Sequence, residues 1–177
     1  MNLPNRLTLM RIIMIPFFVF FLMTSFFPFG KWIAFGLFIA ASLTDFLDGY
    51  IARKNNLVTD FGKFADPLAD KLLVCSALIC LLSLSKINVY IVLIIIARDF
   101  IISGFRLVAA GKGIVIAADW SGKVKTALQM VMILFVIADI PFLSIVTIIL
   151  EIAVVILTVS SLLECLIKNR NVLSEKK

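Results

Sequence analysis

Residues 45–53 read Asp-Phe-Leu-Asp-Gly-Tyr-Ile-Ala-Arg, and the rest of the chain is organised around them. Two long apolar runs flank this region. Five of the eleven acidic residues of the chain fall between positions 45 and 70: Asp45, Asp48, Asp60, Asp66 and Asp70. A carboxylate between membrane-type runs is expensive to keep unless it pairs with a cation or binds one. The sequence therefore predicts a chemical site between two membrane helices.

The spacing of the small and acidic residues predicts that they share helix faces. If the apolar run before residue 45 is helical through Arg53, four residues follow the i, i+3, i+4, i+7 pattern of one face. These four are Asp45, Asp48, Gly49 and Ala52. Asp66 and Asp70 repeat the pattern at i, i+4 on the next helix. Two acidic faces can then meet at one membrane boundary.

Four carboxylates held together predict a metal site. Each like charge raises the pKa of its neighbours, so the four cannot all stay ionised without neutralisation. The chain contains no histidine, and oxygen-only ligands favour a hard ion, one or two Mg²⁺ or Mn²⁺. Gly49 and Ala52 leave room for a bulky ligand, and Arg53 is placed to fork onto a phosphate. These features together indicate phosphoryl chemistry.

The full pattern resembles the signature of the CDP-alcohol phosphotransferase family of integral membrane enzymes. All eight fixed positions match at the family spacing: Asp45, Asp48, Gly49, Ala52, Arg53, Gly62, Asp66 and Asp70. The resemblance implies CDP-diacylglycerol as donor, bound by Asp45, Gly49, Ala52, Arg53 and Gly62. It also implies metal binding by the four aspartates, Asp70 as the base that accepts the acceptor's hydroxyl proton, and a homodimer. Direct in-line displacement is expected, because no histidine is present to form a covalent intermediate.

The composition is that of a membrane protein with several spans. The chain has 177 residues, 62% hydrophobic and 16% charged, with a mean hydropathy of +1.13. One domain over 1–177 is expected, all-α, with a short interfacial segment over Asn2–Arg11. Apolar segments of about 20 residues predict six transmembrane helices, at about 12–29, 32–53, 64–83, 89–109, 124–140 and 142–167.

The basic residues predict the orientation of these helices. Of seventeen Lys and Arg residues, only Lys31 and Lys86 fall on one side of the predicted spans, and the other fifteen fall on or near the opposite side. By the positive-inside rule, both termini and the acidic motif face the cytoplasm. The expected location is the cytoplasmic (inner) cell membrane. Membrane lipids are expected to contact the protein, and no nucleic-acid partner is expected.

A second polar region, residues 98–129, predicts the acceptor. Four basic residues in and after the fourth span suit a phosphorylated acceptor: Arg98, Arg106, Lys123 and Lys125. An ion pair between Asp99 and Arg106 that only holds helices together is the alternative interpretation. The opening of the chain resembles that of phosphatidylglycerophosphate synthases, with Asn2, Pro4, Asn5, Leu7, Thr8 and Arg11 at the matching positions. Glycerol 3-phosphate is therefore the expected acceptor, and phosphatidylglycerophosphate and CMP are the expected products.

Three other functions remain open at this point. The same chemistry could use inositol phosphate, serine or phosphatidylglycerol as acceptor. A divalent-cation transporter would also place acids inside a membrane, but it would spread them through several spans, whereas only Glu151 lies near the middle of one. A non-catalytic scaffold would leave the spacing of the acids unexplained.

Overall fold

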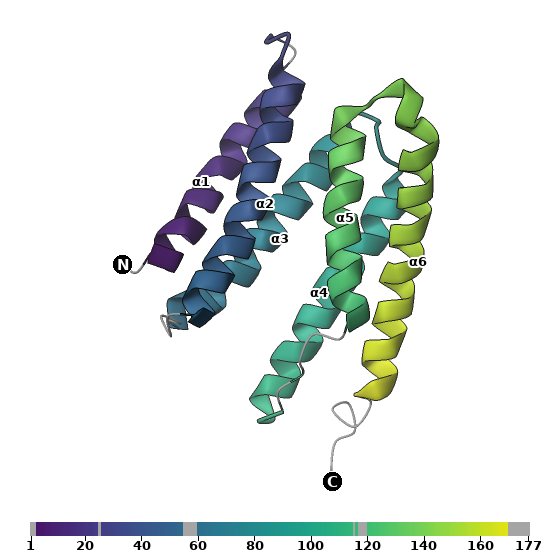
Figure 1. The fold of residues 1–177 in the computed structure, drawn as a ribbon. Coiled ribbons are helices and arrows are strands. Elements are labelled where there is room, and N and C mark those ends of the chain that lie inside the picture. Colours follow the sequence, from purple (N-terminus) through teal and green to yellow (C-terminus); the bar gives the residue numbers. More distant parts are fainter. Residues whose placement is uncertain (1–2, 25, 55–59, 115, 117–119, 170–177) are drawn as a thin grey trace. The chain divides into compact units, whose positions relative to one another are not determined.

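The structure is a computed structural model that describes residues 3–24, 26–54, 60–114, 116 and 120–169. Side chains are described in these ranges except at 3–4, 45–54, 60–61 and 63–64. The described residues form helices and no strands, which confirms the all-α prediction. The helices are α1 Leu3–Met23, α2 Gly30–Lys54, α3 Asp60–Ser83, α4 Val89–Gly111, α5 Trp120–Ala138, the 3-10 turn η1 Pro141–Leu143, and α6 Ser144–Lys168 (Figure 1).

The first helix differs most from its predicted bounds. A span over 12–29 was expected after a separate interfacial segment, whereas α1 is continuous from Leu3 to Met23. Asn5, Thr8 and Arg11 are spaced three residues apart, so they share one face of this helix, and all three side chains are buried. The polar residues that suggested an interfacial segment are instead accommodated inside the protein.

Three helical stretches are long and apolar enough to cross a membrane, as far as the described residues go: Asn5–Met23, Trp120–Ala138 and Pro141–Lys168. A shorter apolar stretch covers Gly30–Thr44. Helix α4 carries Arg98, Asp99 and Arg106 within its 23 residues, so its composition alone does not mark it as a span. The apolar character of the chain is that of a membrane protein.

The chain divides into two compact units. The first contains Met1–Ile87 and Ile133–Asp139. In it, α1 packs against α2 and α3, and Figure 1 shows α1 and α2 side by side. The rings of Phe18 and Phe38 lie 5.7 Å apart between these two helices, and both are fully buried. Gly30 lets α2 begin against α1, because a Cβ there would lie 2.8 Å from the Phe21 carbonyl oxygen.

The second unit contains Asn88–Met132 and Ile140–Lys177. Helices α4 and α6 pack against each other in this unit. Ile102, Phe105 and Ala109 from α4 form a buried core with Cys165 from α6. This core fixes the face of α4 that carries Arg98 and Ile102 toward α6.

Candidate functional site

Helix α2 carries the first half of the acidic motif. It continues to Lys54, so the condition for a shared face over residues 45–52 is met by the backbone. The side chains of Asp45, Asp48, Gly49, Ala52 and Arg53 lie outside those that the structure describes. Their predicted roles therefore stay predictions.

Helix α3 carries the second half of the motif. Asp66 and Asp70 lie one helical turn apart, and both are half-buried, while Gly62 is buried one turn before Asp66. The Thr8 hydroxyl of α1 donates a hydrogen bond to Asp66 Oδ1 at 2.5 Å. The hydroxyl fixes this carboxylate on the face of α3 that packs against α1.

The described acids fit a hard divalent cation. Asp66 and Asp70 offer carboxylate oxygens, the ligands that Mg²⁺ and Mn²⁺ prefer, and the sequence has no histidine to favour a softer ion. Among the described side chains, no three acidic, cysteine or histidine residues come together as a metal cluster. Asp45 and Asp48, which would complete the predicted set of four, lie outside the described side chains.

A second polar group lies in the second unit and joins α4, α5 and α6. Asp99 Oδ1 accepts hydrogen bonds from Lys125 Nζ at 2.7 Å and from Arg98 Nη1 at 3.0 Å. Arg98 Nη2 donates to Ser161 Oγ of α6 at 3.1 Å. We call Arg98, Asp99, Lys125 and Ser161 the buried charge cluster.

Two buried cations of the buried charge cluster bond the same carboxylate. Arg98 and Lys125 are 9% and 1% exposed, and both bond Asp99. Burying an ammonium or guanidinium group is costly unless its charge is matched. Arg98 Nε is also buried, with no hydrogen-bond acceptor among the described residues. An anion, such as a phosphate, would supply Arg98 Nε with an acceptor.

Gly122 of α5 lies close against this cluster. A Cβ at this position would lie 3.3 Å from Arg98 Nη2, tighter than most real Cβ contacts. Glycine therefore leaves the guanidinium its space between α5 and α6.

Comparison with known proteins now identifies the family. Residues 1–160 match the family model of CDP-alcohol phosphatidyltransferase. The chain belongs to the CDP-alcohol phosphatidyltransferase family. The chain is 48% identical, over 141 residues, to a protein of Bacillus subtilis (strain 168) named CDP-diacylglycerol–glycerol-3-phosphate 3-phosphatidyltransferase, covering 73% of each chain. A protein of Rickettsia bellii (strain RML369-C) with the same name is 47% identical over 130 residues, covering 73% of this chain and 71% of its own length.

Only two of the four basic residues predicted for the acceptor site of this CDP-alcohol phosphatidyltransferase come together. Arg98 and Lys125 meet at Asp99, as described above. Lys123 is exposed on α5. Arg106 is half-buried on α4 and has no hydrogen-bond or ion-pair partner among the described residues. The alternative ion pair between Asp99 and Arg106 is therefore wrong, because Asp99 pairs with Arg98 and Lys125 instead.

Sequence reasoning missed two contacts, one in each unit, that hold predicted site residues. Ser161 bonds Arg98 across 63 positions of sequence, and Thr8 bonds Asp66 across 58. A signal for the first was available, since Thr158 and Ser161 stand three residues apart in a mainly apolar helix and both are buried. Thr8 shares its three-residue spacing with Asn5 and Arg11, which marks the same kind of buried polar stripe.

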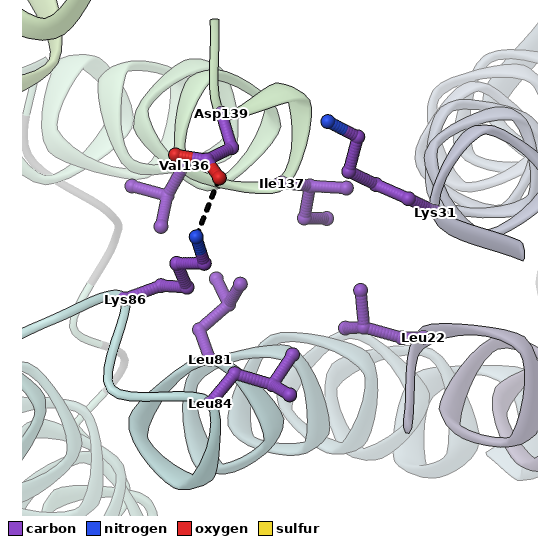
Figure 2. Close-up of a pocket in the computed structure, with 8 residues that line it drawn as sticks. All are labelled: Leu22, Lys31, Leu81, Leu84, Lys86, Val136, Ile137 and Asp139. Atoms are coloured by element: carbon purple, nitrogen blue, oxygen red, sulfur yellow. Dashed lines mark hydrogen bonds and ion pairs between the residues drawn. The ribbon is translucent and has the colours of Figure 1, made fainter. Parts of the chain in front are cut away.

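A further charged group lies in the first unit, around a small pocket at the end of α5. Lys86 Nζ pairs with Asp139 Oδ2 at 2.5 Å, and Lys31 Nζ donates to the Ala138 carbonyl at 2.8 Å. Figure 2 shows these side chains around the pocket, which is otherwise lined by Leu22, Leu81, Leu84, Val136 and Ile137. We call Lys31, Lys86 and Asp139 the outer ion pair group. Lys31 and Lys86 are the two basic residues that the sequence places on one side of the predicted spans, opposite the other fifteen Lys and Arg residues.

Proposed function

We propose that the protein transfers the phosphatidyl group of CDP-diacylglycerol to glycerol 3-phosphate, which yields phosphatidylglycerophosphate and CMP. The observation that carries this proposal is the buried charge cluster, where Arg98 and Lys125 both bond Asp99 Oδ1 and where Arg98 Nε has no acceptor among the described residues. The phosphate of a phosphorylated acceptor offers charged oxygen atoms as acceptors for this guanidinium, which a neutral alcohol lacks. The names of the Bacillus and Rickettsia relatives state the same donor and acceptor.

The four aspartates of the motif form the donor half of the proposed site. Asp45, Asp48, Asp66 and Asp70 would hold one or two Mg²⁺ or Mn²⁺ ions. When bound, such an ion neutralises charge on the diphosphate of the donor. Asp45, Gly49, Ala52, Arg53 and Gly62 would cradle the cytidine diphosphate. Thr8 keeps the carboxylate of Asp66 in place through its hydrogen bond.

Asp70 acts as the base in the proposed reaction. It accepts the proton of the acceptor hydroxyl while the hydroxyl oxygen forms a bond to the lipid-bearing phosphorus. The bond from that phosphorus to the oxygen of CMP breaks in the same displacement, and CMP leaves. The half-buried position of Asp70 leaves its carboxylate within reach of a ligand.

The acceptor half uses the basic residues of α4 and α5. Arg98 and Lys125 bind the phosphate of glycerol 3-phosphate, with Arg98 oriented by Ser161 and Asp99. Arg106 and Lys123 contribute charge around this phosphate. A guanidinium held at two points presents its remaining N–H groups in a fixed direction, which suits a tetrahedral anion.

The proposed setting is the cytoplasmic membrane. The chain acts as one domain with six transmembrane helices, both termini and the site facing the cytoplasm, and it forms a homodimer. Helices α1, α5 and α6 are the ones whose length and composition support a full span. The fifteen Lys and Arg residues on the proposed cytoplasmic side support the orientation.

Metal-dependent release of CMP tests the proposed function. The purified protein in detergent is given CDP-diacylglycerol and, in turn, glycerol 3-phosphate, inositol phosphate, serine or phosphatidylglycerol, with and without Mg²⁺ or Mn²⁺. The expected result is CMP release with glycerol 3-phosphate alone, lost with a chelator and in Asp70→Asn. Turnover with another acceptor would retain the metal site and reject the acceptor assignment. Metal flux in sealed vesicles without CMP release would establish the transporter instead.

A further inference from the structure

Gln129 of α5 is a buried amide whose acceptor oxygen has no donor. The residue is 2% exposed, and its Oε1 finds no hydrogen-bond donor among the described residues. A buried carbonyl oxygen without a donor costs free energy, so such atoms in native proteins usually have a functional or water-mediated partner. The amide oxygen can therefore accept a hydrogen bond from a ligand.

Gln129 lies on the face of α5 that meets the buried charge cluster. Lys125 belongs to this cluster and bonds Asp99 Oδ1, and a Cβ added at Gly122 would lie 3.3 Å from Arg98 Nη2. Gly122, Lys125 and Gln129 follow the i, i+3, i+7 spacing of one helix face. Gln129 therefore stands about one helical turn beyond Lys125, about 6 Å along the same side of the helix.

The proposed acceptor has a group that matches this position. Glycerol 3-phosphate attacks with its C1 hydroxyl and carries its phosphate on C3, so its C2 hydroxyl takes no part in the bond changes. The C2 hydroxyl lies next to the phosphate-bearing carbon, within about one helical turn of the phosphate. A hydroxyl at that place can donate to an amide oxygen.

We propose that Gln129 determines the acceptor specificity of this enzyme by accepting a hydrogen bond from the C2 hydroxyl of glycerol 3-phosphate. This inference rests on the proposed function and adds to it the recognition of a phosphorylated polyol with a secondary hydroxyl. Arg98 and Lys125 recognise the phosphate, which any phosphorylated alcohol carries. Gln129 distinguishes among such alcohols, because an analogue without the hydroxyl leaves the amide oxygen without a donor.

A deoxy acceptor tests the inference directly. We compare glycerol 3-phosphate with 3-hydroxypropyl phosphate, which keeps the attacking hydroxyl and the phosphate and lacks the C2 hydroxyl. For the wild type, kcat/KM is expected to favour glycerol 3-phosphate by about tenfold or more, the effect of one hydrogen bond to a buried acceptor. In Gln129→Met, which keeps the length and removes the acceptor, this preference is expected to fall to about twofold or less. The KM for CDP-diacylglycerol is expected to be unchanged.

Gln129→Glu serves as the matched control. A carboxylate keeps two acceptor oxygens, so this variant is expected to retain the preference for glycerol 3-phosphate even if its added charge weakens phosphate binding for both acceptors. Retention in Gln129→Glu with loss in Gln129→Met supports recognition through an accepted hydrogen bond. A merely structural role would lower the rate with both acceptors in parallel.

Two results would overturn the inference. One is a wild-type kcat/KM that is nearly equal for the two acceptors. This result is measured without a variant, so it can be obtained even if Gln129→Met does not fold. The other is an unchanged preference in Gln129→Met, which would mean that the amide bonds water or serves packing only. Failure of the proposed function looks different, because the wild type would then release no CMP with glycerol 3-phosphate.

Discussion

The buried charge cluster and the outer ion pair group use the same residue types in opposite settings. Both pair a lysine with an aspartate and bring a second basic residue close. Lys125 is 1% exposed, whereas the side chain of Lys86 is 44% exposed. The same ion pair therefore costs desolvation in one region and almost nothing in the other.

Burial gives the two groups different uses. An exposed pair is screened by solvent and contributes little, so the pair of Lys86 and Asp139 only joins the turn after α3 to the end of α5. In the buried group, Arg98 Nε has no acceptor among the described residues, and an anion would lower the cost of burying this guanidinium. The comparison predicts that substitutions in the buried charge cluster change catalysis and that those in the outer ion pair group do not.

The largest effect is expected at Arg98. Arg98→Met removes the guanidinium that bonds Asp99 and Ser161, and with it the fork that binds the acceptor phosphate. Loss of one member of a buried, hydrogen-bonded charge set lowers kcat/KM for glycerol 3-phosphate on the order of 100-fold or more. Arg98→Lys should fall between this variant and the wild type, because it keeps the charge without the planar fork. Wild-type kinetics in Arg98→Met would remove Arg98 from the site.

A smaller effect is expected at Ser161, which orients Arg98 without touching the acceptor. Ser161→Ala removes one hydrogen bond to Arg98 Nη2 and should raise the KM for glycerol 3-phosphate by about three- to tenfold. Ser160→Ala is the matched control, since Ser160 is exposed on the same helix and its hydroxyl donates to the Leu157 carbonyl one turn earlier. Equal kinetics in the two variants would show that Arg98 keeps its position without Ser161.

At Gly122, stability and activity should change in opposite directions. Gly122→Ala adds a Cβ 3.3 Å from Arg98 Nη2, so the guanidinium must shift by a few tenths of an ångström. We expect a loss of about two- to fivefold in kcat/KM for glycerol 3-phosphate. The helix should gain up to about 1 kcal/mol from the better helix former, visible as a higher Tm in detergent. Gly104→Ala, where the added atom meets nothing within 4 Å, should leave the kinetics unchanged.

The smallest effect is expected at Asp139. Asp139→Asn removes the exposed ion pair with Lys86 and keeps a residue that tolerates the left-handed backbone at φ 46°. The free energy of unfolding should change by about 1 kcal/mol or less, and CMP release should be unaffected. Thermal unfolding of both proteins in the same detergent measures the first, and a clear loss of activity would contradict the second.

Part of this fold followed from sequence alone. The apolar runs predicted an all-α protein, and the start of α4 and the ends of α2, α3 and α6 lie within two residues of their predicted bounds. These elements are predictable because hydrophobic length and turn residues act locally. The start of α1 was not, because Asn5, Thr8 and Arg11 look interfacial until another helix is present to bury them.

The sequence predicted which types of residue form the candidate site, but it did not predict which of them pair with one another. Asp99 and Arg106 stand seven residues apart on one stripe, which suggested a pair within α4. Lys125, 26 residues away, bonds Asp99 instead, because α5 brings its ammonium group to that face of α4. Which residue pairs with Asp99 depends on the neighbouring helices, and the spacing of residues within one helix carries no information about them.

A single paired measurement tests the central claim most directly, that the buried charge cluster binds the acceptor phosphate. Lys125→Met and Lys86→Met make the same change, one in each charged group, and kcat/KM for glycerol 3-phosphate is measured for both beside the wild type. We expect a loss on the order of 100-fold in Lys125→Met, with the KM for CDP-diacylglycerol unchanged, and wild-type kinetics in Lys86→Met. Equal kinetics in the two variants, or a loss confined to Lys86→Met, would contradict the claim.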